Sequence, residues 1–240
     1  MPAALKYPFE MMAVENQYGV FDDFTGDQTD LYWVDTITDS GSAAVGDAVR
    51  GIMTLTPSDG SVADNDEVYL ATANEIFKLA DNKPLWAVCY AKFTEANTTQ
   101  ANWAFGFQNA VGADSIIDDA GGLKVSGDCI AIYKVDGGTT WKCVSVVNGG
   151  TANVSTSART ATSSSYQKLE IDVQPLSSTN AVITYKVDNS YLTDSTTGLV
   201  IRHTVAYASA TEMNLFIGSK NGSAHNQVVL VDYIGGWQAR

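Results

Sequence analysis

The chain has 240 residues, of which 45% are hydrophobic and 17% are charged, and its formal net charge is −13. A chain of this size is globular and can bury a core without a metal or disulfide, and all-β domains of this length are often single units. The acidic charge repels phosphate backbones, so we expect no nucleic-acid partner. No apolar run reaches the length of a membrane span and no export signal opens the chain, so we expect no membrane association and folding in a reducing cytoplasm.

Residues 1–20 differ from the rest of the chain because their apolar side chains follow neither the period of a strand nor that of a helix. We predict an extended N-terminal arm over residues 1–20 and one sandwich domain over residues 21–240. The free energy gained by burying the arm nearly cancels the entropy lost in ordering it, so we expect the arm to be fixed on a partner surface. The candidate partner-binding residues are Leu5, Tyr7, Phe9, Met11 and Met12.

Short strands follow. In the first half of the chain we expect them at residues 31–34, 49–55, 67–71, 76–79, 84–93 and 103–107. Residues 84–93 carry apolar side chains on both faces, which is typical of a central strand. The acidic, glycine-rich residues 111–127 predict a long loop.

The second half contains the clearest turn. Residues 129–135 and 140–147 flank Asp136-Gly137-Gly138-Thr139, and paired glycines accept the positive φ angles of a tight hairpin. Residues 148–165 predict a polar loop or edge, and further strands are expected at residues 166–173, 181–187, 199–206, 213–217 and 228–234. Many short alternating strands without an amphipathic helix predict an all-β, two-sheet antiparallel sandwich.

The sequence contains few candidate catalytic groups. His203 and His225 are the two histidines, and neither lies near a nucleophile motif. Carboxylates cluster at Asp22-Asp23, Asp64/Asp66/Glu67, Asp118-Asp119 and Glu170/Asp172. Glu170 and Asp172 share a polar strand face, as the paired carboxylates of a glycosidase would, but the tight motif of such enzymes is missing. A solvated strand face is the better interpretation, and we predict no catalytic residue and no enzymatic activity.

Metal, cofactor and sugar-stacking sites are weakly indicated. Clustered carboxylates in the long loop offer oxygen ligands of the kind Ca²⁺ prefers, but they lack the spacing of an EF-hand. They are Asp114, Asp118, Asp119 and Asp128. We therefore predict an acidic surface loop, with no metal and no cofactor. Trp33, Trp141 and Trp237 are candidates for stacking on sugars, whereas Trp86 and Trp103 lie in apolar strands and are expected in the core.

The three cysteines are predicted to be free thiols. Cys89 lies in an apolar run that is typical of a buried core strand. Cys129 and Cys143 flank the predicted hairpin about three positions off-pair, judged from its short loop.

Three segments resemble concanavalin-like (laminin-G-like) sandwiches. Residues 20–24 (VFDDF) with Trp33 resemble their opening strand, residues 184–189 (TYKVDN) a characteristic strand and turn, and residues 229–234 (VLVDYI) the closing strand, which pairs near the first. The resemblance implies a concanavalin-like jelly roll that covers nearly the whole domain.

The middle of the chain resembles head structural proteins of tailed bacteriophages that act as capsid decoration, or cement, proteins. The resemblance is carried by residues 64–70 (DNDEVYL), 75–78 (EIFK), 83–86 (KPLW), 92–97 (KFTEAN) and 133–138 (YKVDGG). It implies a homotrimer, made in the host cytoplasm, that binds the major capsid protein on the outer surface of the virion and stabilises its lattice. The alternative is a carbohydrate-binding, lectin-like module of a tail fibre or host-recognition protein, and a degenerate glycoside hydrolase or lyase is a third.

Overall fold

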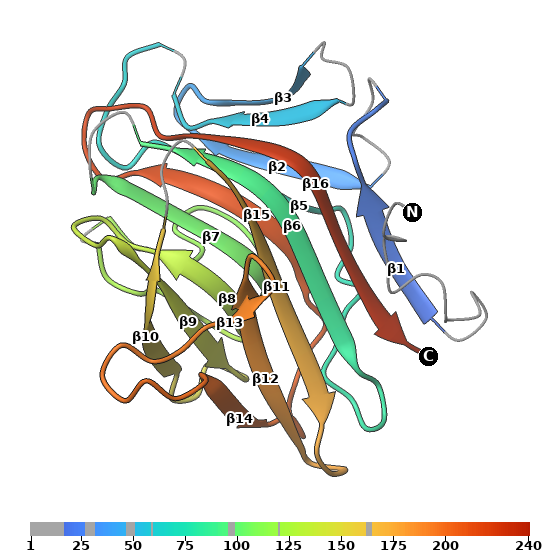
Figure 1. Cartoon of the computed structure of the whole chain (residues 1–240). Coiled ribbons are helices and arrows are strands. Elements are labelled where there is room, and N and C mark those ends of the chain that lie inside the picture. Colours follow the sequence, from blue (N-terminus) through green and yellow to red (C-terminus); the bar gives the residue numbers. More distant parts are fainter. Residues whose placement is uncertain are drawn as a thin grey trace, which may run out of the picture.

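The computed structural model describes residues 17–26, 32–46, 51–58, 60–95, 99–119, 121–161 and 165–240. Within these ranges the chain forms sixteen strands and no helix, so the expected all-β, two-sheet antiparallel sandwich is confirmed (Figure 1). Accordingly, the described ranges contain no helix that is long and apolar enough to cross a membrane.

Sheet A has nine strands, and its central strand β6 is hydrogen-bonded to β11 on one side and to β16 on the other. In chain order its strands are β1 (Gln17–Asp22), β3 (Ser42–Gly46), β4 (Ile52–Thr56), β6 (Leu85–Thr94), β11 (Tyr166–Pro175), β12 (Asn180–Val187), β13 (Ser190–Tyr191), β14 (Arg202–Ala206) and β16 (Val228–Ala239). The central position predicted for residues 84–93 is therefore confirmed.

Sheet B has seven strands in the order β10-β9-β8-β7-β15-β5-β2. They are β2 (Trp33–Thr38), β5 (Glu67–Thr72), β7 (Ala101–Gln108), β8 (Cys129–Lys134), β9 (Thr140–Val146), β10 (Asn153–Thr160) and β15 (Asn214–Asn221). The hairpin predicted around Gly137 is present as β8–β9, and Gly137 has the positive φ of 72° that the turn requires.

The two ends of the described chain lie side by side. β1 pairs antiparallel with the last part of β16, from Gln17 opposite Ala239 to Asp22 opposite Ile234, as expected for a closing strand that returns to the first (Figure 1). Residues 17–20, which the sequence assigned to the arm, thus belong to sheet A, with Val20 in the core.

The space between the sheets holds one large apolar core. Side chains alternate along the strands of sheet A, so that Leu169, Ile171 and Val173 of β11 point inward while Lys168 and Asp172 point outward. Large aromatic side chains fill the centre of the core, and those fully buried include Trp103, Trp141, Tyr185, Phe93, Phe105 and Phe107.

A second, smaller apolar cluster lies on the outer face of sheet B. The long loop after β7 places Ile116 and Ile117 against Tyr69 and Phe216 of that face. This loop confirms the prediction for residues 111–127. It also means that the loop covers part of the outer face of sheet B.

The cysteines are buried and unpaired. Cys129 lies opposite Val146 and Cys143 opposite Ile132, so the two are three register positions apart. Cys129 faces the cluster outside sheet B and Cys143 faces the main core, which rules out a disulfide between them.

Candidate functional site: an aromatic strip on sheet A

Six aromatic rings form a continuous row on the outer face of sheet A, which we call the aromatic strip. In order along the row they are Tyr166 of β11, Tyr90 of β6, Tyr233 of β16, Phe21 of β1, Trp237 of β16 and Trp86 of β6. The order shows that four neighbouring strands contribute to one surface.

Neighbouring rings of the strip are close, and each pair is stacked or tilted. Their centroids are 5.0 Å apart for Tyr166–Tyr90, 5.6 Å for Tyr90–Tyr233, 5.8 Å for Tyr233–Phe21, 6.1 Å for Phe21–Trp237 and 4.8 Å for Trp237–Trp86. The interplanar angles lie between 27° and 35°. Distances in this range are those of favourable aromatic pairs, so the row is packed and ordered.

Strand register explains why the rings meet. Trp86 lies opposite Trp237, and Tyr90 lies opposite Tyr233, in the pairing of β6 with β16. Val231 and Ile234 both point into the core, although they are three residues apart. In a regular strand, Tyr233 would share the inward face of Val231, two residues before it. A register shift between Val231 and Tyr233 inserts one residue and turns Tyr233 to the outer face.

Gly235 lets the rings lie close to the sheet. A Cβ atom at this position would lie 2.6 Å from Cη2 of Trp237 and 2.9 Å from Cδ2 of Phe21. Any larger residue would therefore push these rings outward. The absence of a side chain at Gly235 gives the strip its low profile.

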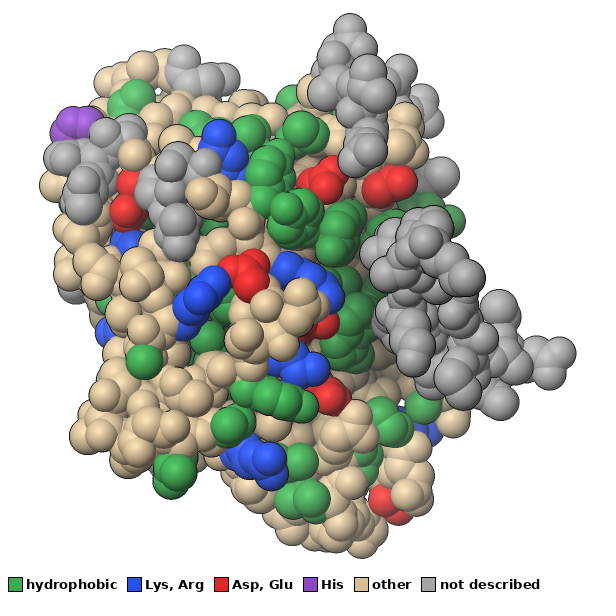
Figure 2. Space-filling model, in the orientation of Figure 1, with side chains coloured by type: hydrophobic (Ala, Val, Ile, Leu, Met, Phe, Trp, Pro, Cys, Tyr) green, Lys and Arg blue, Asp and Glu red, His purple; other side chains and the backbone are tan. Residues whose placement is uncertain are grey.

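The strip is partly open to solvent. Phe21 is 44% exposed and the other five rings are half-buried. Figure 2 shows hydrophobic side chains in a band across this face, with Lys, Arg, Asp and Glu side chains beside them. An exposed apolar band rimmed by polar groups is typical of an interaction site.

Charged side chains of β11 border the strip. Lys168 lies opposite Tyr90, Glu170 opposite Val88, and Asp172 opposite Trp86. The Lys168 ammonium is 3.0 Å from Glu170 Oε1, and Asp172 accepts a 2.6 Å hydrogen bond from Gln174. Glu170 is only 7% exposed, and its Oε2 has no hydrogen-bond partner among the described residues.

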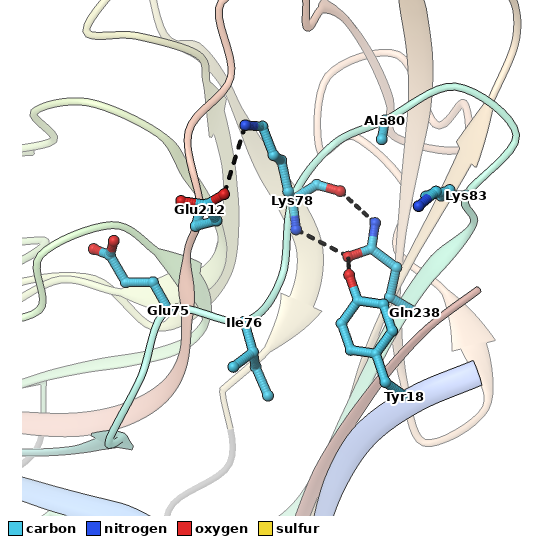
Figure 3. Close-up of a pocket in the computed structure, with 8 residues that line it drawn as sticks. All are labelled: Tyr18, Glu75, Ile76, Lys78, Ala80, Lys83, Glu212 and Gln238. Carbon is cyan, nitrogen blue, oxygen red and sulfur yellow. Dashed lines mark hydrogen bonds and ion pairs between the residues drawn. The ribbon is translucent and has the colours of Figure 1, made fainter. Parts of the chain in front are cut away.

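A pocket of about 420 Å³ lies near the tryptophan end of the strip (Figure 3). Its lining residues are Tyr18, Glu75, Ile76, Lys78, Ala80, Lys83, Glu212 and Gln238. Gln238 follows Trp237 directly in β16, and its Oε1 accepts bonds of 2.5 Å from the Tyr18 hydroxyl and 2.9 Å from the Lys78 amide. These bonds, drawn in Figure 3, fix the wall of the pocket rather than leave a reactive group free.

The acidic loop residues do not form a calcium site. Asp114 and Asp119 both bind the ammonium of Lys220, with 2.7 Å for Asp119. Asp118 accepts the Gly122 amide at 2.7 Å, and Asp128 accepts the Asn148 amide at 2.7 Å. Within the described ranges, no group of three His, Cys, Asp or Glu residues is placed to hold a metal ion.

The other carboxylates and His203 have structural contacts. Asp22 accepts the Trp33 indole N–H at 2.8 Å, and Asp66 accepts the Ala63 amide at 2.8 Å. His203 is buried among three hydroxyl groups, those of Ser145, Ser155 and Tyr185, at 3.0–3.1 Å. Burial lowers the pKa of His203 to about 4.

The sequence predicted the positions of the tryptophans only in part. Trp237 lies on the aromatic strip, as a sugar-stacking candidate would, but Trp33 and Trp141 are buried in the core and were wrongly proposed. Trp103 is in the core as expected, whereas Trp86, also expected there, is half-exposed on the strip. Both faces of β6 carry large apolar residues, so alternation alone could not show that one face is open. The arm candidates Leu5, Tyr7, Phe9, Met11 and Met12 lie outside the described residues.

Comparison with known proteins shows the fold. No family model and no curated protein matches the sequence. An endo-1,3-beta-glucanase from Streptomyces sioyaensis is similar, with a TM-score of 0.56, 13% identity and coverage of 95% of this chain and 98% of the other. The carbohydrate recognition domain of Emp47p has a TM-score of 0.55, 10% identity and coverage of 94% and 98%. A protein of unknown function from Shewanella oneidensis MR-1 has a TM-score of 0.54, 13% identity and coverage of 93% and 87%. The chain thus has the concanavalin-like jelly-roll fold of lectins and glucanases.

Proposed function

We propose that the protein is a carbohydrate-binding protein and that its ligand lies on the aromatic strip. The observation that carries the proposal is the run of six stacked or tilted, partly exposed rings on an outer sheet face. Similarity to lectins and a glucanase supports it at the level of the fold alone.

The strip has the two kinds of contact that a sugar needs. The C–H groups of a pyranose ring form apolar faces, which pack on flat aromatic rings, while the hydroxyl groups around its edge seek hydrogen bonds. Rings of the strip supply the first contact. Lys168 and Asp172, which lie opposite Tyr90 and Trp86, stand where they can supply the second.

The proposal is for binding without hydrolysis. Glu170 and Asp172 are the carboxylates nearest the strip, but Lys168 holds Glu170 at 3.0 Å and Gln174 holds Asp172 at 2.6 Å. A glycosidase needs two carboxyl groups free to act on either side of one bond. Incubation with soluble polysaccharides should release no reducing ends; turnover that is lost in Glu170→Gln would overturn this part of the proposal.

The capsid-decoration role, its homotrimer and its major capsid protein partner stay predictions that rest on the sequence resemblance. The similar structures named above lend them no support. Copurification of the protein with virion heads would test them independently of any glycan.

The binding proposal is tested by titrating a panel of soluble polysaccharides and following heat and tryptophan fluorescence. The wild type should bind at least one of them, and Trp86→Ala should weaken that binding about tenfold by removing one stacking ring. Tyr32→Ala is the matched control, because Tyr32 is 62% exposed and precedes β2 in sheet B. Equal losses in both variants, or no binding by the wild type to any glycan, would contradict the proposal.

A further inference from the structure

We propose that Ser155 is a nucleophile that His203 activates, and that its hydroxyl takes an acyl group from an activated ester. The proposal is independent of carbohydrate binding. The aromatic strip lies on the outer face of sheet A, whereas His203 joins strands of sheet A to strands of sheet B. The sequence does not indicate the pair, because 48 positions separate the two residues and only the fold brings them together.

His203 lies on β14, and its two ring nitrogens face different surroundings. Nε2 lies 3.1 Å from the hydroxyl of Ser155 on β10, the edge strand of sheet B. Nδ1 lies 3.0 Å from the hydroxyl of Ser145 and 3.1 Å from that of Tyr185, and both of these residues are completely buried. One nitrogen therefore faces the edge of the sandwich, and the other faces its interior.

The hydrogen bonds of this cluster assign its protons. Tyr185 has a single hydroxyl proton, which it donates to the Val144 carbonyl at 3.0 Å. Its oxygen can then only accept, so the proton of the neutral imidazole lies on Nδ1. Burial keeps the ring neutral, because it lowers the pKa of His203 to about 4. Nε2 therefore carries the lone pair and accepts the proton of the Ser155 hydroxyl.

This orientation is the one that a hydroxyl nucleophile requires. A serine hydroxyl is a weak nucleophile, and it becomes a stronger one when an adjacent base accepts its proton during the attack. A further group must hold the base in the correct tautomer. Nε2 of His203 is placed as the base for Ser155, and the oxygen of Tyr185 holds the ring in that tautomer.

Ser155 is the open member of the cluster. Its side chain is partly exposed on β10, and Val154 before it is exposed. Ser145 and Tyr185 are completely buried, and His203 is only 6% exposed. A small ester can therefore approach the Ser155 hydroxyl from the edge of the sandwich, while the base behind it is shielded from water.

The reaction is an acyl transfer. Oγ of Ser155 attacks the carbonyl carbon of the ester and forms a new C–O bond, while its proton passes to Nε2 of His203. The bond from that carbon to the leaving phenolate breaks, and the phenolate takes the electron pair. The imidazolium then gives its proton to the phenolate, so Ser155 ends as an ester and His203 as it began. An activated ester is required, because a base with a pKa of about 4 gives modest assistance.

The experiment incubates the full chain with p-nitrophenyl acetate and follows acetylation by peptide mapping, which separates Ser155 from acetylated amines. Ser155 should be acetylated, and His203→Gln should slow that reaction about tenfold by removing the base. Ser190, which is exposed on β13, is the control serine and should react far more slowly. Ser155→Ala should lose the acetyl group from this peptide, whereas Ser190→Ala should leave the rate at Ser155 unchanged.

The pH profile separates activation from a purely structural role of the histidine. A serine that reacts through its alkoxide speeds up about tenfold per pH unit, whereas a neutral imidazole gives a level rate wherever the pH lies well above its pKa. The rate at Ser155 should therefore be level from about pH 6 to 8. Melting temperatures show whether each variant is folded, and the wild-type profile decides if His203→Gln is not.

Three results would overturn the proposal. They are equal acetylation of Ser155 and Ser190, a rate at Ser155 that rises about tenfold per pH unit, and an unchanged rate in folded His203→Gln. None of them depends on whether the protein binds a glycan, so this proposal and the proposed function can fail separately.

Discussion

The ammonium group of Lys220 on β15 lies 2.7 Å from the carboxylate of Asp119 and 3.9 Å from that of Glu67. Lys220 and Glu67 are almost completely buried. Asp114 binds the Lys220 ammonium directly through one carboxylate oxygen, and its other oxygen lies 3.1 Å from the ammonium of Lys124 on the exposed side. The cluster fastens the long loop to the outer face of sheet B, and this accounts for acidic loop residues that resemble calcium ligands in sequence.

Removing the buried ammonium of Lys220 should destabilise the fold more than removing the exposed carboxylate of Asp119. Lys220→Met leaves Glu67 buried without its partner, and we expect a loss of roughly 3 kcal/mol in the free energy of unfolding. Asp119→Asn should cost less than about 1 kcal/mol, because that side chain is 68% exposed. Urea denaturation measures both. Equal losses would show that the cluster does not act through the buried charge.

His203 should make stability depend on pH. Its folded pKa of about 4 lies below the value near 6.5 of an unfolded histidine, so the unfolded chain binds more protons between these values. Stability from this group is therefore full above about pH 6.5 and is lost as the pH falls towards 4, by roughly 3 kcal/mol.

The measurement compares urea denaturation of the wild type and His203→Gln across that range. The variant should lose less stability on acidification, by about the stated amount. Identical pH dependence in the two proteins would mean that the histidine is not held neutral by its burial.

Gly235→Ala should weaken glycan binding without unfolding the protein. The added Cβ meets the ring ends of Trp237 and Phe21, which can shift outward because they lie at the surface, so the stability loss should stay near about 1 kcal/mol. Displacement of Trp237 and Phe21 breaks their stacking within the strip, and affinity should fall several-fold. Gly112→Ala is the control, because a Cβ there meets nothing within 4 Å. If affinity is unchanged in Gly235→Ala, the close approach of these rings to the sheet does not determine binding.

Deleting residues 1–20 should destabilise the sandwich. The deletion removes four of the six residues of β1, the buried Val20 and the hydrogen bond from Tyr18 to Gln238. Burial of Val20 alone contributes roughly 2 kcal/mol. Comparison with a chain that lacks only residues 1–16 isolates the contribution of the strand. A melting temperature unaffected by the longer deletion would contradict the pairing of β1 with β16.

Local patterns in the sequence predict most of the strands. Alternation in β11 and β12 and the glycines of the β8–β9 turn are decided by neighbouring residues, so they are visible without the fold. The pairing of the closing strand with the first followed from the resemblance to concanavalin-like sandwiches and is confirmed.

The aromatic strip could not be predicted in the same way. Its six rings come from four strands that are distant in sequence, and Tyr233 reaches the outer face only through a register shift that no local pattern marks. Trp237 was a candidate for stacking on sugars, but its partner Trp86 was assigned to the core because β6 is apolar on both faces. Which face of a central strand is covered depends on loops elsewhere in the chain.

The central claim is that the aromatic strip binds carbohydrate. It is tested most directly by a glycan array probed in parallel with the wild type, the double variant Trp86→Ala/Tyr90→Ala and the control Tyr32→Ala. The account predicts that the wild type and Tyr32→Ala bind the same glycans and that the folded double variant binds none of them. Retention of the same glycans by the double variant, or a wild type that binds no glycan, would contradict it.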